Sequence, residues 1–255
     1  MKRLAASEVS FAEPPSQLLR IQHIHNLGEY ESGGSRLMKN LPILFCLILS
    51  SMAFSVIGLV FSSNIQLGSL TPTTETLDES GNPIEGDPLF PVTMPGVAQQ
   101  GEAVYVDLGC IACHTQQVRR AGFGTDIDRG WGKRHTVARD YVTQGHVLVG
   151  SQRVGPDLKT IGERQEEANW HHLNLYNSKI ISGDRSIMPR YAFLYDVREI
   201  EGTTAANALQ FEAGSPYAPA AGFEVVPTQR AEVLVEYLLS LKLNYSLPEA
   251  QISEK

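Results

Sequence analysis

Cys110-Ile111-Ala112-Cys113-His114 is the stretch from which the fold of this chain can be predicted. Its Cys-x-x-Cys-His pattern is typical of the attachment site of a c-type haem. Cysteines three apart lie on one face of a helical turn, so both sulfurs can form thioether bonds to the vinyl groups of one porphyrin. His114 then lies where its imidazole can bind the iron as the proximal ligand. We therefore predict one covalent haem c, bound by Cys110, Cys113 and His114.

Two other kinds of site share the Cys-x-x-Cys core. A thioredoxin-like redox site would follow a strand and would not need His114. A structural zinc site usually takes four Cys or His ligands, and the third cysteine, Cys46, lies in an apolar run far from the motif. Both comparisons favour haem attachment.

Length and charge set further limits. With 255 residues the chain has room for one or two domains. Its formal net charge is −7 and no basic stripe gathers along it, so we exclude nucleic acid as a partner.

An uncharged apolar stretch from Leu41 to Phe61 predicts a transmembrane helix over residues 38–62. A spanning helix needs about 20 such residues. A cleaved signal peptide has a shorter apolar region, of about 7–15 residues, and a small-residue cleavage site, to which Phe61-Ser62-Ser63-Asn64 is a poor match. We therefore expect a permanent anchor in contact with membrane lipid.

The charges beside this helix predict its orientation. Arg36 and Lys39 precede it, and no Lys or Arg follows before Arg119. The residues after it include the acidic Glu75, Asp78, Glu79, Glu85 and Asp87. By the positive-inside rule the N-terminus is cytoplasmic and the haem motif lies outside. We expect a single-pass protein of the bacterial inner membrane with a periplasmic haem domain.

The rest of the chain divides into four segments. Residues 1–37 have scattered charges and little periodicity, which predicts a disordered cytoplasmic arm or a start placed before the true one at Met38. The other segments are 63–97, an extracytoplasmic tether rich in turn residues; 98–243, the cytochrome c domain; and 244–255, a tail.

Two helices are expected to close the haem domain. Residues 98–108 carry a broken apolar stripe that Gly109 ends. From Pro227 and Thr228 a second run places Val233, Leu234, Tyr237, Leu238 and Leu241 on one face. We expect the two helices to pack on each other.

Met188 is the expected second iron ligand. Methionine paired with histidine gives a haem a high reduction potential. Met188 lies well after His114, and Pro189 disfavours helical geometry at it, which suits a ligand loop. Met94 is the alternative methionine. Distal histidine is the rival to both, and the histidines that follow the motif are His135, His146, His171 and His172.

Pro156 and Arg153 complete the predicted site. The Pro156 carbonyl, in Gly155-Pro156-Asp157-Leu158, can accept a hydrogen bond from the proximal imidazole and fix its tautomer. Arg153 is the expected partner of a haem propionate, because arginine pairs bidentately with a carboxylate.

The order of these motifs resembles a known family. Cys-His-Thr-Gln-Gln-Val-Arg from Cys113, Gly-Ser-Gln-Arg-Val-Gly-Pro-Asp-Leu from Gly150 and Ser-Ile-Met-Pro from Ser186 follow one N-terminal span. The region from Met38 to Leu243 resembles the membrane-anchored monohaem cytochrome c subunit, subunit II, of cbb3-type cytochrome c oxidases.

This resemblance implies a fold, ligands and partners. The fold would be mainly α, a class I cytochrome c-like haem domain with a long insert, behind one transmembrane helix. Cys110 and Cys113 would bind the haem, and His114 and Met188 the iron. The partners would be a haem–copper oxidase catalytic subunit and a dihaem cytochrome c subunit or other donor cytochrome. Residues 196–227 depart from the family pattern.

The leading hypothesis is an electron-transfer subunit of a terminal oxidase with no independent catalysis. It would relay single electrons from a donor cytochrome to the catalytic subunit in aerobic respiration. The alternative is a free-standing membrane-tethered cytochrome c shuttle. A haem peroxidase is a third hypothesis, but it would need an open iron site, which a bound Met188 would close.

Overall fold

The computed structural model describes residues 27–252, with side chains from Asn40 onward. Residues 1–26, which hold most of the predicted cytoplasmic arm, lie outside the described residues. The chain forms two compact units, Met1–Ser69 and Leu70–Lys255. Each unit is described separately below.

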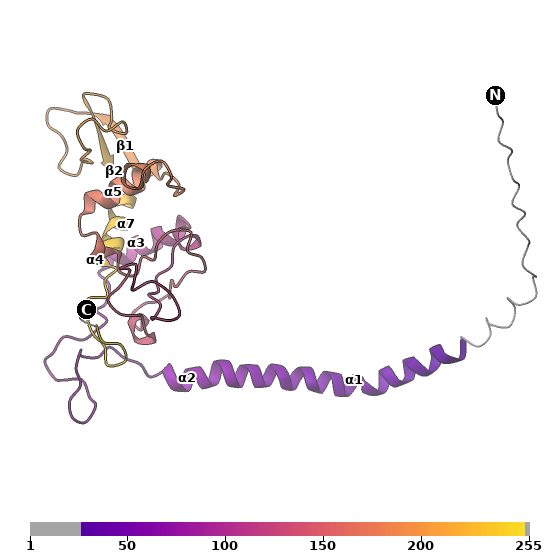
Figure 1. Cartoon of the computed structure of the whole chain (residues 1–255). Helices are drawn as coiled ribbons and strands as arrows, with labels where there is room; N and C mark the ends of the chain where they lie inside the picture. Colours follow the sequence, from indigo (N-terminus) through magenta and orange to yellow (C-terminus); the bar gives the residue numbers. More distant parts are fainter. Residues whose placement is uncertain (1–26, 253–255) are drawn as a thin grey trace, which may run out of the picture. The chain divides into compact units, whose positions relative to one another are not determined.

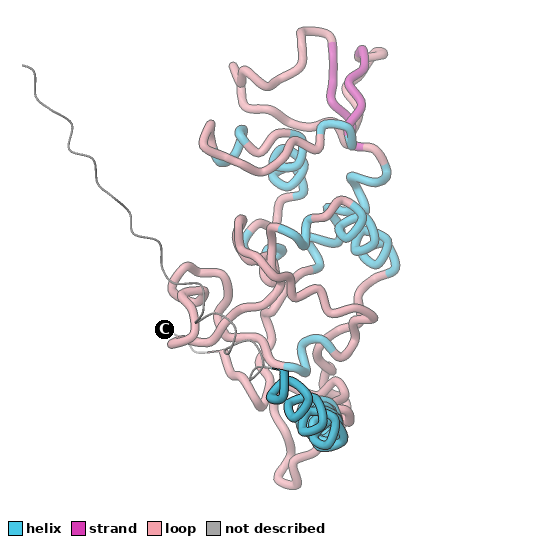
Figure 2. The backbone as a smooth tube through the Cα atoms, turned by 90° about the vertical axis from the view of Figure 1, so that its right-hand side faces the viewer, coloured by secondary structure: helices cyan, strands magenta, loops and turns pink. Residues whose placement is uncertain are grey.

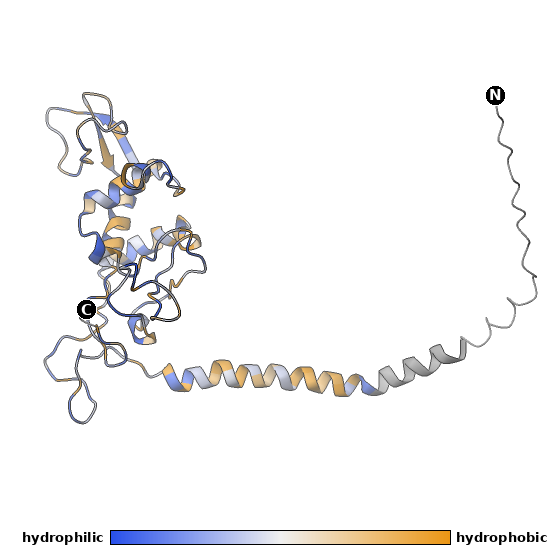
Figure 3. Ribbon diagram, viewed as in Figure 1, coloured by the Kyte–Doolittle hydropathy of each residue, from blue (hydrophilic) through white to orange (hydrophobic). Residues whose placement is uncertain are grey.

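The described part of the first unit is a long helix (Figure 1). It consists of α1 (Leu27–Ser55), a π-helical turn η1 (Val56–Phe61) and α2 (Ser62–Leu67). Asn40–Leu67, 28 residues, is long and apolar enough to cross a membrane. At 1.5 Å per residue this stretch is about 42 Å long, against a hydrocarbon core of about 30 Å. Figure 3 shows the apolar residues along it.

The helix exceeds the predicted span of 38–62 at both ends. Residues 27–37 are helical, whereas the sequence predicts them to be part of a disordered arm. Extending an existing helix costs much less than nucleating one, so the apolar span can carry its polar flanks into helix.

Two helices form the centre of the second unit. They are α3 (Gly96–Asp107) and α7 (Gln229–Ser240), the two helices expected from the sequence. Their backbones approach closely at Gly101, where an added Cβ would lie 1.9 Å from the Val233 carbonyl oxygen. The ring centroids of Tyr105 and Tyr237 lie 5.3 Å apart. The expected packing of these helices is therefore confirmed.

The remaining helices of the second unit are short. They are α4 (Ile161–Arg164), α5 (Ala168–Tyr176), α6 (Lys179–Ser182) and the 3₁₀ turns η2 (Cys110–Ala112), η3 (Ala138–Tyr141) and η4 (Ala192–Leu194). Long loops join them (Figure 2). The structure is mainly helical, as the sequence predicts.

One pair of strands was not expected. β1 (Tyr195–Glu199) and β2 (Phe223–Pro227) pair antiparallel, with Tyr195 opposite Pro227 and Glu199 opposite Phe223. They lie at one end of the second unit, with the C-terminal residues at the other (Figures 1 and 2). The two strands form the ends of a long loop segment between residues 195 and 227.

The second unit extends beyond the predicted domain of 98–243. It begins at Leu70, and Tyr245 and Leu247 are buried in a small apolar cluster with Val118 and Leu243. Phe90 stacks on Tyr245, with ring centroids 4.7 Å apart. Parts of the predicted tether and tail thus pack against the predicted haem domain, because their aromatic and apolar side chains share a small core with it.

Candidate haem site

The haem motif directly follows α3. Gly109, with φ of +72°, turns the chain out of the helix, and Cys110–Ala112 form the 3₁₀ turn η2. The sequence predicts a helical turn here, and a 3₁₀ turn also brings residues three apart to one face. The His114 amide donates to the Cys110 carbonyl at 3.0 Å and closes the motif.

Both motif cysteines are free and half-buried. Burial raises the pKa of the Cys110 thiol to about 11, so this sulfur is protonated at neutral pH. The Tyr191 hydroxyl interacts with it.

The imidazole of His114 is held by Pro156. Its Nδ1 lies 2.8 Å from the Pro156 carbonyl oxygen. A carbonyl only accepts, so Nδ1 carries the proton and Nε2 keeps its lone pair. Burial lowers the pKa of the imidazole, although the Pro156 hydrogen bond and the Asp157 charge oppose this. His114 therefore presents a neutral imidazole with Nε2 available to a metal, in the contact predicted for Pro156.

Gly155 lies against the same ring and was not identified from the sequence. A Cβ at Gly155 would lie 2.2 Å from Cε1 of His114 and 2.8 Å from its Nε2. No side chain fits there, so the glycine lets the loop approach the imidazole. Gly155 belongs to the Gly-Pro-Asp-Leu motif, but a glycine alone does not indicate which side chain lies against it.

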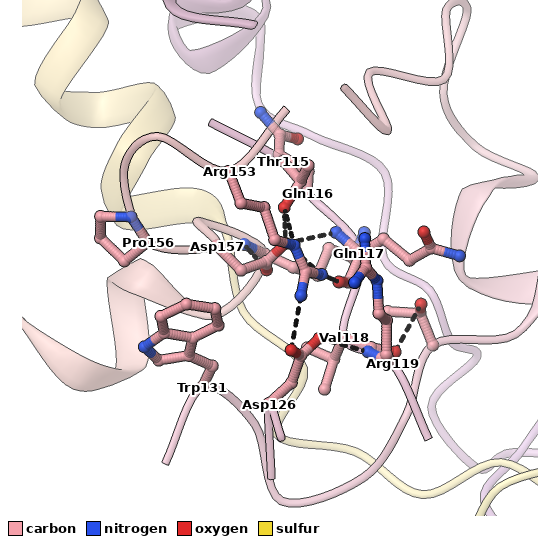
Figure 4. A network of polar contacts seen from close by, with 12 residues as sticks. Thr115, Gln116, Gln117, Val118, Arg119, Asp126, Trp131, Arg153, Pro156 and Asp157 are labelled. Carbon is pink, nitrogen blue, oxygen red and sulfur yellow. Dashed lines mark hydrogen bonds and ion pairs between the residues drawn. The ribbon is translucent and has the colours of Figure 1, made fainter. Parts of the chain in front are cut away.

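Arg153 has protein partners in the structure (Figure 4). Its Nε donates to Thr115 Oγ1 at 2.8 Å, and its two Nη atoms donate to Asp126 Oδ1 and to the Gln117 carbonyl, each at 2.5 Å. All three guanidinium nitrogens thus donate to protein acceptors. The propionate contact stays a prediction, and the structure shows a different use of this side chain.

Met188 belongs to the wall of the main core. Met188, Cys110 and Ile111 all pack against the same buried apolar cluster, the one that contains Tyr105 and Tyr237. Ser178 Oγ donates to the Met188 carbonyl at 3.2 Å, and Asn174 Nδ2 lies 3.8 Å from the Met188 sulfur. Tyr191, three residues later, reaches Cys110. The methionine loop is therefore connected to the haem motif.

Met94 also contacts the main core, and it lines a cavity. This cavity, of about 1070 Å³, has Glu102, Val106, His146 and Tyr245 among its lining residues. None of residues 110–114 is among them. The haem motif therefore does not line the cavity that Met94 lines.

The rival histidines have their own partners. Buried His171 on α5 donates from Nε2 to the Gln165 carbonyl at 2.9 Å. His172 Nδ1 lies 3.2 Å from the Tyr195 hydroxyl, and burial lowers its pKa to about 4. Both contacts suit structural histidines.

This donor set fits a porphyrin better than a bare metal ion. Within residues 40–252, whose side chains the structure describes, no group of three or more His, Cys, Asp or Glu residues could hold a metal ion. A porphyrin supplies four nitrogen ligands itself, so the iron needs only His114 and one further ligand. The neutral imidazole of His114, the two motif thiols and the Met188 thioether are the donor types that such a group would need, and Cys110 and Met188 share one apolar core.

Comparison with known proteins identifies the family. The comparison with curated proteins finds no match. The sequence model of a family described as "Cytochrome C oxidase, mono-heme subunit/FixO" matches residues 49–237, most of the chain. The match includes the haem motif, Pro156 and Met188, and it confirms the family resemblance drawn from these motifs. The chain therefore belongs to the FixO family of mono-haem cytochrome c oxidase subunits.

Proposed function

We propose that this chain is the electron relay of a cbb3-type oxidase. It would accept single electrons from a dihaem cytochrome c subunit or another donor cytochrome and pass them to the haem–copper catalytic subunit. A c-type haem held covalently by Cys110 and Cys113 would supply the one-electron step. The chain itself contributes binding, orientation and electrostatics.

One observation carries this proposal. The Nδ1 of His114 donates a hydrogen bond to the Pro156 carbonyl, so Nε2 would be the atom that binds iron. In the same motif, Cys110 interacts with Tyr191, which lies three residues after Met188. Cys110 and Met188 pack against the same apolar core, and Cys113 and His114 complete the motif, so these four residues would supply two thioether links, an imidazole and a thioether to a bound haem. Such a set suits six-coordinate electron transfer rather than an open catalytic iron.

The fold supports a class I cytochrome c-like domain. In it, α3 leads into the haem motif and α7 crosses α3 at Gly101. The residues between the motif and Gly155 form the long insert, which returns the chain to the His114 ring. The short helices α5 and α6 then position the Met188 loop.

The proposed location follows from the helix and its flanks. Asn40–Leu67 would cross the bacterial inner membrane once, with the basic flank in the cytoplasm. The haem domain would then lie in the periplasm, where it can meet a donor cytochrome.

Replacing Met188 tests the ligand assignment. We expect Met188→Ala to remove the sulfur-to-iron absorption band of the oxidised protein and to lower the reduction potential, because the thioether stabilises reduced iron. The reduced variant should also bind carbon monoxide, whereas the parent protein should not. Met94→Ala is the matched control and should keep the parent spectrum. A band that survives in Met188→Ala and is lost in Met94→Ala would reverse the assignment.

Purification in mild detergent tests the relay. We expect an oxidase catalytic subunit and a second haem-staining chain to co-purify with this protein, as mass spectrometry can show. Recovery of the chain alone, with haem attached, would favour the free shuttle.

A further inference from the structure

A buried polar network adjoins the haem motif (Figure 4). At its centre is Asp157, whose side chain is fully buried. Its Oδ2 accepts from Thr115 Oγ1 at 2.6 Å and from the Gln117 amide at 2.8 Å, and its Oδ1 accepts from the Lys159 amide at 2.9 Å. The carboxylate therefore joins the residues just after His114 to the loop that carries Pro156.

Arg153 extends this network to the insert. Its guanidinium binds Thr115 and the Gln117 carbonyl on one side and Asp126 on the other. It also lies 3.5 Å from Asp157, and its Cζ is 5.6 Å from the centre of the Trp131 ring. Figure 4 shows the side chain extended between the two acids. Hydrogen bonds of this kind, between charged groups, are stronger than hydrogen bonds between neutral groups.

Asp126 fixes the outer end of the network. It is buried, and its Oδ2 accepts from the Arg119 amide at 2.7 Å while Oδ1 takes the Arg153 hydrogen bond. The Asp126–Arg153–Asp157 network thus places two carboxylates around one guanidinium.

The network holds both partners of the His114 hydrogen bond. Pro156 lies between Arg153 and Asp157 in the chain, and His114 lies next to Thr115. Two backbone bonds add to this, from the Gly155 amide to the Cys113 carbonyl at 3.0 Å and from the Leu158 amide to the Thr115 carbonyl at 2.8 Å. Fixing these segments fixes the distance and angle between Nδ1 and the Pro156 carbonyl oxygen.

We infer that the Asp126–Arg153–Asp157 network is a positioning device for the proximal histidine that sets the strength of its Nδ1 hydrogen bond and, through it, the reduction potential. The inference rests on the proposed function, since it requires iron at His114. The hydrogen bond to Nδ1 makes a ligating imidazole more basic, and a more basic ligand favours oxidised iron. In this arrangement Arg153 acts through Thr115, Asp157 and Pro156.

The two roles considered for Arg153 predict different behaviour. If Arg153 were the partner of a haem propionate, its effect on the potential would depend on its positive charge and would not depend on Asp126. If Arg153 were a positioning residue, its effect would depend on the several N–H donors of its guanidinium and on the buried Asp126 carboxylate that accepts from one of them. Arg153→Lys keeps the charge and loses the fork. Asp126→Asn keeps the shape and loses the charge and one acceptor.

The test uses the haem-loaded full-length chain within its complex. Two quantities are measured for each variant: the reduction potential, and the solvent exchange of the His114 Nδ1 proton by NMR of histidine-labelled protein. We expect both Asp126→Asn and Arg153→Lys to raise the reduction potential. We also expect both variants to speed the exchange of the Nδ1 proton by up to about tenfold, the equivalent of one hydrogen bond. Glu249→Gln is the control, because it removes an acid from the Arg139 ion pair outside the network, and it should change neither quantity.

Several outcomes would overturn the inference. Parent-like potential and exchange in Asp126→Asn and Arg153→Lys would remove the positioning role, as would equal shifts in Glu249→Gln. If Asp126→Asn does not load haem, Arg153→Lys decides alone. Failure of the parent chain to load haem would instead refute the proposed function, so the two failures are distinguishable.

Discussion

At the scale of single residues, the site depends on how closely the loop before Pro156 approaches His114. The Pro156 carbonyl could be foreseen, because a carbonyl beside a proximal imidazole has a clear chemical use. Gly155 could not, since the absence of a side chain gives no signal until the ring that occupies its space is placed. Asp126 and Arg153 are 27 residues apart along the chain, so their pairing depends on tertiary structure.

Gly155→Ala tests this close approach. The added methyl would meet His114 Cε1 at 2.2 Å, so either the ring or the loop must move. We expect a loss of stability of about 1–3 kcal/mol, typical of overpacking, and weaker haem loading. Denaturant unfolding and the haem-to-protein absorbance ratio measure both. Gly145→Ala is the matched control, since nothing lies within 4 Å of its added Cβ. Equal behaviour of the two variants would contradict the close approach.

At the scale of elements, the sequence predicted the helices better than the strands. Apolar periodicity and Gly109 indicated α3, and Thr228 followed by an amphipathic run indicated α7. Only one of the five residues of β1 is buried, so it lacks the alternation of buried and exposed residues that is typical of a half-buried strand. Its partner β2 lies beyond a long loop, and pairing at that separation is set by tertiary contacts rather than by local sequence.

Gly101→Ala tests the crossing of α3 and α7. The new Cβ would lie 1.9 Å from the Val233 carbonyl oxygen and 2.7 Å from Tyr237 Cβ, so the helices must separate. We expect a cost of about 1–3 kcal/mol in the free energy of unfolding. Gly96→Ala, in the same helix with nothing within 4 Å of its Cβ, should be neutral or slightly stabilising. A Gly101→Ala protein as stable as Gly96→Ala would show that the helices do not pack this closely.

At the scale of the whole molecule, one chain combines an apolar helix with a separate compact unit. The compact unit begins at Leu70, so it includes residues of the segment 63–97 that the sequence predicts to be a tether. Its tether and tail carry single aromatic residues, such as Phe90 and Tyr245, whose stacking joins segments distant in sequence. The exposed Arg139–Glu249 ion pair adds a further contact to the C-terminal segment.

The central claim is that a haem is bound covalently to this chain at Cys110 and Cys113. The most direct measurement is the intact mass of the mature protein, made in a host competent for cytochrome c maturation and freed of non-covalent cofactor. We expect a mass greater than that of the polypeptide by one haem, and a bare mass when both cysteines are replaced by alanine. A parent chain with only the mass of its amino acids would contradict the account.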